Sequence, residues 1–233
     1  MNATPSFSGF PKQTLTFFRN LAKNNDKLWF DSHREEYEKF VAAPSRDFVL
    51  ALGDKLKRIS PAVHADPRTN QSIFRINRDT RFSHDKTPYK THLGIWFWEG
   101  ARPRMECSGF YFHLEPGRLM LGVGLYMFPK ELLDLFRQSV VHPKHGPLLT
   151  KAVADIRKKK GYFWGNQSYK KTPPGYDPHH PNAEFLLYNG LHAGVELPIS
   201  PEVYKPGLAD LCFNHYKTLL PLHAWLLALT NRT

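Results

Sequence analysis

The chain has 233 residues, of which 41% are hydrophobic and 23% are charged. Such a composition can bury a sizeable hydrophobic core, which excludes a wholly disordered chain. The length suits one large domain or two small ones, and we expect a single domain over residues 1–233. The formal net charge is +11 at pH 7. A basic protein concentrates anionic ligands around itself, although the charge alone does not identify them.

Cysteine usage and hydropathy bear on the cellular location of the protein. The two cysteines, Cys107 and Cys212, lie far apart in the sequence. This spacing argues against a disulfide scaffold and favours a reducing compartment, so we expect a cytoplasmic protein. The N-terminus lacks the apolar run of a secretory signal, and no run of about eighteen apolar residues could span a membrane. We therefore expect no membrane partner.

Residues 10–60 show the periodicity of helices. Apolar residues recur at helical spacing from residue 15 to 22, and Asn24 provides a stop signal. A second helix is expected from Asp26 to Phe40. Pro44 predicts the start of a third helix, because a proline in the first turn lacks only an N–H that would be unpaired there.

Residues 73–127 show the pattern of strands. The apolar runs 109–115 and 118–127 flank Pro116-Gly117, a turn pair, which predicts a β-hairpin. Within the first run, large apolar residues occupy alternate positions, so one face of the hairpin should join the core. The aromatic run 93–99 predicts a further strand.

The remainder of the chain predicts mainly helices. We expect helices within residues 129–160, a long proline-rich loop at 162–181, a short edge strand at 195–199 and a terminal helix at 206–229. The resulting fold class is α+β, with a mostly antiparallel sheet packed against N-terminal and C-terminal helices.

Residues 74–92 are unusually rich in charge for a segment beside a strand, since strands favour β-branched and aromatic residues. If residues 73–82 formed a strand, Arg75, Asn77, Asp79 and Arg81 would share one face. Two guanidiniums in such a row suit the recognition of a phosphate or carboxylate, because each can donate two parallel hydrogen bonds.

The leading hypothesis is therefore an anion-recognising pocket, either binding or catalytic, for a phosphate- or carboxylate-bearing small molecule. The residues expected to act on the ligand are Asp79, Lys86 and Tyr89. The residues expected to hold it are Arg75, Arg78, Arg81, Asp85, Lys90 and His92. The sequence identifies no cofactor and no oligomeric state.

Two other hypotheses explain the same residues. Residues 67–104 carry eight basic and three acidic residues, and residues 144–171 carry eight basic residues and one acidic residue, so these basic segments could bind nucleic acid. Alternatively, the charges of the segment pair with one another as a structural network. The spacings of His142 with His145 and of His179 with His180 do not match a known metal motif, so no metal site is predicted.

The charged segment also resembles a known family. The run Arg75-x-x-Arg78-Asp79-x-Arg81-Phe82, followed by Asp85-Lys86-x-x-Tyr89, is similar to the signature of a bacterial family, the domain of unknown function 2461. Further similarities are the opening Phe7-x-Gly9-Phe10, Asn24-Asn25, Trp29-Phe30 and Gly109-Phe110-Tyr111. The resemblance covers nearly the whole chain and marks these residues as the hallmark of the family, but it implies no activity.

Overall fold

The computed structural model describes residues 7–232, which form two compact units. Unit 1 comprises residues 7–97, 111–121 and 196–214. Unit 2 comprises residues 98–110, 122–195 and 215–232. The expectation of a single domain stays a prediction.

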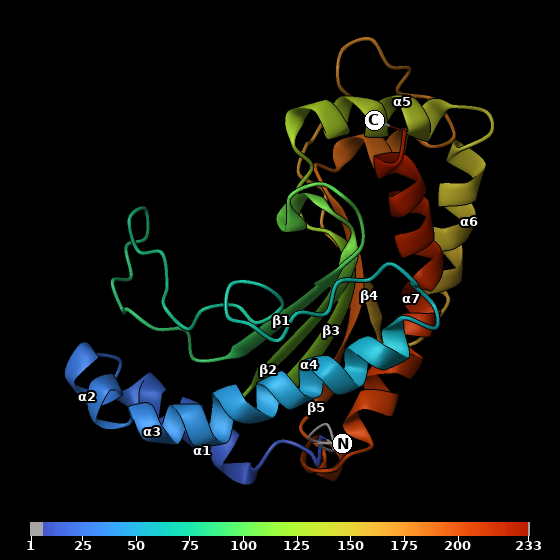
Figure 1. The fold of residues 1–233 in the computed structure, drawn as a ribbon. Helices are drawn as coiled ribbons and strands as arrows, with labels where there is room; N and C mark the ends of the chain where they lie inside the picture. The colour runs from blue at the N-terminus through green and yellow to red at the C-terminus, as the bar shows by residue number, and fades with distance from the viewer. Residues whose placement is uncertain (1–6, 233) are drawn as a thin grey trace. The chain divides into compact units, whose positions relative to one another are not determined.

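A five-stranded antiparallel sheet, together with helices, confirms the predicted α+β class (Figure 1). Its strands are β1 (Leu93–Trp98), β2 (Gly109–Glu115), β3 (Arg118–Leu125), β4 (Tyr162–Trp164) and β5 (Leu191–Pro198). The order across the sheet is β1-β2-β3-β5-β4. The predicted hairpin joins β2 to β3, and its turn contains Gly117 at φ 111°, a conformation that glycine adopts without strain.

Three expectations about strands were wrong. Residues 73–82 form no regular strand, and only isolated bridges at Ile73 and Asn77 occur there, in keeping with the low strand propensity of Asn and Asp. The expected loop 162–181 begins with β4. The expected edge strand at 195–199 is β5, which starts at residue 191 and lies between β3 and β4.

The N-terminal helices belong to unit 1. They are α1 (Lys12–Lys23), α2 (Lys27–Ser32), α3 (Arg34–Tyr37), the π-helix η1 (Glu38–Ala42) and α4 (Ala43–Leu56). The Asp26 side chain caps α2 by accepting a hydrogen bond from Trp29 N at 2.9 Å. The expected single helix from Asp26 to Phe40 is instead divided at His33, whose φ of −113° departs from helical geometry.

The third helix, α4, starts at Ala43 with Pro44 in its first turn, as predicted, but it follows the π-helix η1 without a break. Proline cannot donate to the carbonyl four residues earlier, which here is Phe40 O. The Thr14 hydroxyl donates to that oxygen at 2.5 Å, and the π-helix η1 accommodates the irregularity. A contact from α1 therefore satisfies the carbonyl that the proline leaves unpaired.

The remaining helical elements follow β1. They are η2 (Arg104–Glu106), α5 (Lys130–Val141), α6 (Gly146–Arg157), η3 (Ala183–Leu187), η4 (Pro201–Tyr204) and α7 (Leu208–Thr230). The terminal helix α7 contains Pro221 and runs close to the predicted bounds. No helix within residues 7–232 is both long enough and apolar enough to cross a membrane.

Candidate functional site

Residues 74–92, which we call the charged loop, are the last part of the connection from α4 to β1 and contain no helix or strand (Figure 1). Its two legs are joined by backbone hydrogen bonds. Arg78 N donates to Pro88 O at 2.8 Å, and Lys90 N donates to Ile76 O at 2.8 Å. Residues 79–87 therefore form a tip held by a short ladder.

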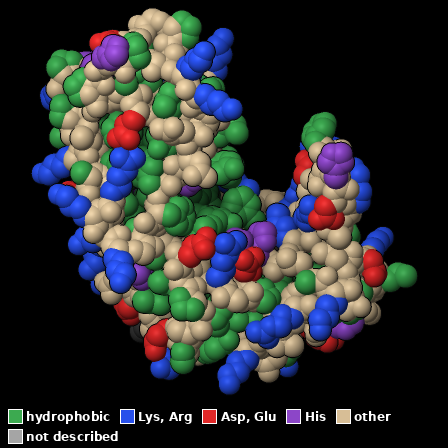
Figure 2. All heavy atoms as spheres, turned by 180° about the vertical axis from the view of Figure 1, so that it is seen from behind, with side chains coloured by type: hydrophobic (Ala, Val, Ile, Leu, Met, Phe, Trp, Pro, Cys, Tyr) green, Lys and Arg blue, Asp and Glu red, His purple; other side chains and the backbone are tan. Residues whose placement is uncertain are grey.

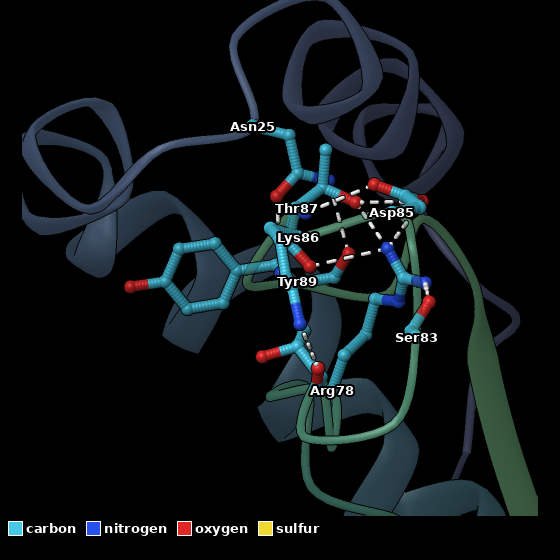
Figure 3. A network of polar contacts seen from close by, with 8 residues as sticks. Asn25, Arg78, Ser83, Asp85, Lys86, Thr87 and Tyr89 are labelled. Carbon is cyan, nitrogen blue, oxygen red and sulfur yellow. Dashed lines mark hydrogen bonds and ion pairs between the residues drawn. The ribbon is translucent and has the colours of Figure 1, made fainter.

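Arg78 ties the tip of the charged loop together (Figure 3). Its NH1 group contacts Asp85 Oδ2 at 2.5 Å, Thr87 O at 3.1 Å and the Thr87 hydroxyl. Asp85 Oδ1 in turn accepts from Thr87 N at 2.9 Å, and these contacts with Thr87 and Arg78 lower the pKa of Asp85. Arg78 and Asp85 were expected to hold a ligand, but these contacts are with the loop itself.

Asn25 fastens the charged loop to the helical part of unit 1. Its amide donates to Tyr89 O at 2.9 Å and accepts from Tyr89 N at 3.0 Å. The Tyr89 ring stacks on Phe30 with centroids 4.3 Å apart, and burial raises the pKa of its hydroxyl. Figure 3 shows this ring directed away from the Arg78 contacts. Tyr89, which the sequence suggested as a catalytic residue, therefore anchors the loop.

The tip carries an exposed ion pair and an exposed aromatic ring. Arg81 Nε and NH2 bind the two carboxylate oxygens of Asp79 at 2.9 and 2.6 Å, and these hydrogen bonds lower the pKa of Asp79 to about 2. Lys86 Nζ donates to Thr80 O at 3.0 Å. Phe82 is 94% exposed. Figure 2 shows basic, acidic and histidine side chains gathered on this loop.

The row of polar residues expected along residues 73–82 does not form, because the segment is not a strand. Arg81 pairs with Asp79 at the tip, whereas Arg75 lies at the foot of the charged loop, by which we mean residues 74–78 and 88–92. There the Lys90 ammonium donates to Arg75 O at 2.6 Å. The candidate ligand-binding residues are therefore divided between the tip and the foot.

A second group of polar side chains lies on β2 in unit 1. Tyr111, His113 and Glu115 occupy alternate positions, so they share one face of the strand, opposite Phe112. The ring of His92, which precedes β1, stacks on His113 with centroids 4.2 Å apart. We call His92, His113 and Glu115 the histidine cluster.

Hydrogen bonds and ion pairs hold the members of this cluster in place. The Tyr111 hydroxyl lies 3.2 Å from His113 Nδ1, so Nε2 of the same ring is directed to Glu115, whose Oε2 is 3.2 Å away. Arg118 Nε donates to Glu115 Oε1 at 2.5 Å, and Arg118 NH1 donates to Glu196 Oε1 at 2.9 Å. Glu115 is thus fixed between an imidazole and a guanidinium.

Burial shapes the electrostatics of this group. It lowers the pKa of His92 to about 4, with further lowering from His113, Lys90 and Arg118 against the opposing effect of Glu115. Burial also lowers the pKa of His113 and raises that of Tyr111 to about 12. Burial would raise the pKa of Glu115, but the contacts with His113 and Arg118 outweigh it, so that pKa is lowered.

His92, His113 and Glu115 are also residues that could hold a metal ion. Each offers one ligand atom, and these atoms all lie within 4.8 Å of one another. His92 was predicted as a ligand-binding residue, whereas His113, Glu115, Tyr111 and Arg118 were missed. Tyr111, His113 and Glu115 alternate along the strand, and this pattern could have indicated a polar face. The sequence did not show that His92 lies beside His113, so it could not indicate a group of metal ligands.

A further polar cluster lies in unit 2. Ser108 Oγ lies 2.9 Å from His223 Nδ1, and His223 Nε2 lies 3.3 Å from Glu99 Oε2. A serine, a histidine and a carboxylate in this sequence can form a nucleophilic triad. Here Ser108 is 0% exposed and His223 is 1% exposed, so a substrate could not reach the hydroxyl in this conformation. The cluster is therefore best explained as a buried structural network.

The second basic segment, residues 144–171, is divided among different structures. Lys158, Lys159 and Lys160 are exposed after the end of α6. The aromatic residues 162–164 form β4, which pairs with β5 in the sheet. Trp164 also packs edge-on against Tyr188, so this ring contributes to the packing of unit 2.

The comparisons with known proteins identify the family of this chain. The model of the family described as "Conserved hypothetical protein (DUF2461)" matches residues 13–225. No match was found among curated proteins. The matched residues include the charged loop, the histidine cluster and most of α7. The family match thus agrees with the resemblance of the charged segment, and the chain belongs to the DUF2461 family.

Proposed function

We propose that the protein binds a small phosphate- or carboxylate-bearing molecule at the foot of the charged loop, beside the histidine cluster. The observation that supports this is the electrostatic environment of His92, which contains the cations Lys90 and Arg118 together with the His113 ring. Glu115 is the acidic residue acting on the same ring. Clustered cations and imidazole N–H donors suit an anionic oxygen ligand.

This proposal revises the roles of the residues that the sequence suggested. Lys90, His92 and Arg75 lie at the foot and are the candidates for anion contact. Arg78 and Asp85 stiffen the loop. The bound anion is either a ligand or the substrate of a reaction, and both require that the protein binds it.

Lys90→Gln should weaken binding of the anion about 10–150-fold, because a hydrogen bond to a charged group contributes about 1.5–3 kcal/mol. A thermal-shift screen of the wild-type protein against nucleotides, sugar phosphates and carboxylates would first find a ligand. A ligand at 100 times its Kd adds about 2.7 kcal/mol of stability, or roughly 5–11 °C for a chain of this size.

Lys86→Gln is the matched control for this prediction. Lys86 and Lys90 belong to the same loop, and the ammonium group of each donates to a backbone carbonyl. Both variants lose one charge and one such contact, but Lys86 lies at the tip. If both variants lost the same affinity, the anion would bind elsewhere, or the loss would come only from the lower net charge. Either result would contradict a contact with Lys90. Lys90→Arg should retain most of the affinity.

We propose single-stranded nucleic acid as a second candidate ligand, because of the exposed tip. Phe82 is 94% exposed, and the Arg81 guanidinium lies 5.7 Å from the centre of its ring. An exposed ring beside cations suits stacking on a base together with attraction of the backbone phosphates. Binding of this kind should weaken steeply as the salt concentration rises, since bound phosphates release counterions.

Phe82→Ala should reduce affinity for a fluorescent oligothymidylate about 5–150-fold, because stacking contributes about 1–3 kcal/mol per base. Fluorescence anisotropy at low salt would measure the change. Leu28→Ala is the control, since Leu28 is another large apolar residue of unit 1 and is 85% exposed. Binding that is absent at low salt, or that both variants preserve, would remove this candidate.

A further inference from the structure

The histidine cluster has the composition of a metal-binding site. Its donor atoms are two imidazole nitrogens and one carboxylate oxygen, all within 4.8 Å of one another. A tetrahedral zinc site with bonds of about 2.0–2.2 Å holds neighbouring ligand atoms roughly 3.3–3.6 Å apart. The donor atoms are therefore within about one ångström of that spacing, and one of the two stacked imidazole rings would also rotate so that both nitrogens face the ion. Among residues 7–232, no other group of three His, Cys, Asp or Glu side chains brings its donor atoms so close together.

One donor atom of the cluster is open to a further ligand. Nε2 of His113 is buried and makes no hydrogen bond, although Glu115 Oε2 lies 3.2 Å away. Buried polar atoms are usually paired, and an exception calls for an explanation such as an ion. A metal ion placed between the imidazole and the carboxylate would satisfy both groups.

The surrounding residues orient the donors as the outer partners of metal ligands do. The Tyr111 hydroxyl contacts His113 Nδ1 at 3.2 Å, which leaves Nε2 for the ion. Arg118 holds Glu115 Oε1, while Oε2 of the same carboxylate faces His113. Contacts of this kind fix ring orientation and carboxylate position in metal sites.

From these observations we propose that His92, His113 and Glu115 bind one divalent first-row metal ion, with zinc as the first candidate. Imidazole ligands favour such ions over calcium or magnesium. Two histidines and one carboxylate leave at least one coordination position for another ligand. The proposed metal centre does not depend on the proposed function. The further statement that the anion occupies the open coordination position does rest on the proposed function.

The charges of the site support an anion at the open position. The ion would add two positive charges, and Glu115 is the one carboxylate among the three ligands. Lys90 and Arg118 contribute to the electrostatic environment of His92. An oxygen of a phosphate or carboxylate could therefore coordinate the ion while the cations offset the remaining charge. In this arrangement, Tyr111 and Arg118 are positioning residues.

Metal binding by the whole chain would test the centre directly. After treatment with a chelator and its removal, the protein is titrated with Zn²⁺ by calorimetry and with Co²⁺ by visible absorption. One equivalent should bind, and bound Co²⁺ should show the spectrum of a coordinated ion. His92→Gln should weaken binding by more than about 100-fold, and Tyr111→Phe by about 10–100-fold.

His142→Gln is the matched control for His92→Gln. The His142 ring stacks on His145 with centroids 4.5 Å apart, so this change also removes one imidazole from a stacked pair. The control should bind one equivalent with unchanged affinity. Failure of the wild-type protein to bind one equivalent would overturn the proposal. Unchanged affinity in a folded His92→Gln protein would overturn it equally.

Inorganic phosphate separates the metal centre from the proposed anion site. If phosphate shifts the Co²⁺ spectrum of the wild-type protein, the anion occupies the open position. If Co²⁺ binds but its spectrum does not change when phosphate or small carboxylates are added, the result would support the metal centre and contradict anion coordination. Phosphate binding that Lys90→Gln abolishes, in a protein that binds no metal, would support the proposed function and reject the metal centre.

Discussion

His223→Ala should destabilise the protein by about 2–5 kcal/mol, because it leaves a cavity in the core of unit 2 and removes a partner of the buried Glu99 carboxylate. The His223 side chain is 2% exposed and that of Glu99 is 10% exposed, with 3.3 Å between Nε2 and Oε2. The substitution also removes the ring that contacts Ser108 Oγ at 2.9 Å and packs on Phe110. Reversible urea unfolding would measure the change in free energy.

His179→Ala provides the control for this prediction. His179 belongs to the same unit and is exposed, so its loss should change the stability by no more than about 0.5 kcal/mol. A His223→Ala protein as stable as this control would contradict a structural role for the buried network. The network would then need another explanation, because buried polar groups are costly when they are not well paired.

The same histidine should contribute to acid sensitivity. Burial lowers the pKa of His223 below its ordinary value of 6.5, against the opposing effect of Glu99. The unfolded chain therefore takes up a proton first as the pH falls, and the stability present above 6.5 declines toward the pKa of the folded state. His223→Gln, which keeps hydrogen-bonding groups but does not titrate, should lose less stability between pH 6.5 and 5 than the wild type.

Gly9→Ala should destabilise the protein by about 2–6 kcal/mol. Gly9 has a φ of 108°, where a side chain is strained, at a cost of about 1–3 kcal/mol. A Cβ there would also lie 2.3 Å from Tyr204 C, a backbone atom that cannot move aside easily. The clash adds about 1–3 kcal/mol. It should also displace the adjacent hydrogen bond from Phe10 N to Val203 O.

Gly117→Ala is the control that separates the cost of a positive φ from the cost of the clash with Tyr204. Gly117 has nearly the same φ, 111°, but a Cβ at this position would have no atom within 4 Å beyond its chain neighbours. This variant should show the conformational cost alone, about 1–3 kcal/mol. Thermal or urea unfolding of both variants would give the difference. Equal losses would mean that the approach of Tyr204 does not explain why glycine occurs in the Phe7-x-Gly9-Phe10 motif.

The local elements were largely predictable from the sequence because their signals are local. Periodic apolar residues identified helices in residues 10–60, and Pro116-Gly117 identified the hairpin. The break at His33 and the π-helix that joins α3 to α4 were not predictable in this way. The second depends on Thr14, which belongs to another helix and supplies the missing donor.

The candidate site was predictable only in part. The sequence drew attention to the charged segment, and the structure places His92 and Lys90 of that segment at its foot. It could not show that Arg78 turns toward Asp85 and Thr87, because that depends on the fold of the tip. An arginine that binds a ligand and an arginine that binds a carboxylate of the same chain use the same guanidinium group, so the residue type alone does not distinguish the two roles.

The sequence by itself determined the α+β class, the hairpin and the family, since these depend on periodicity, turn chemistry and a continuous motif. Only the tertiary structure brought His92 against His113, twenty-one positions later in the chain, and placed Glu115 beside the same ring. Strand pairing and loop packing decide such neighbours, and they depend on burial across the whole unit rather than on adjacent residues.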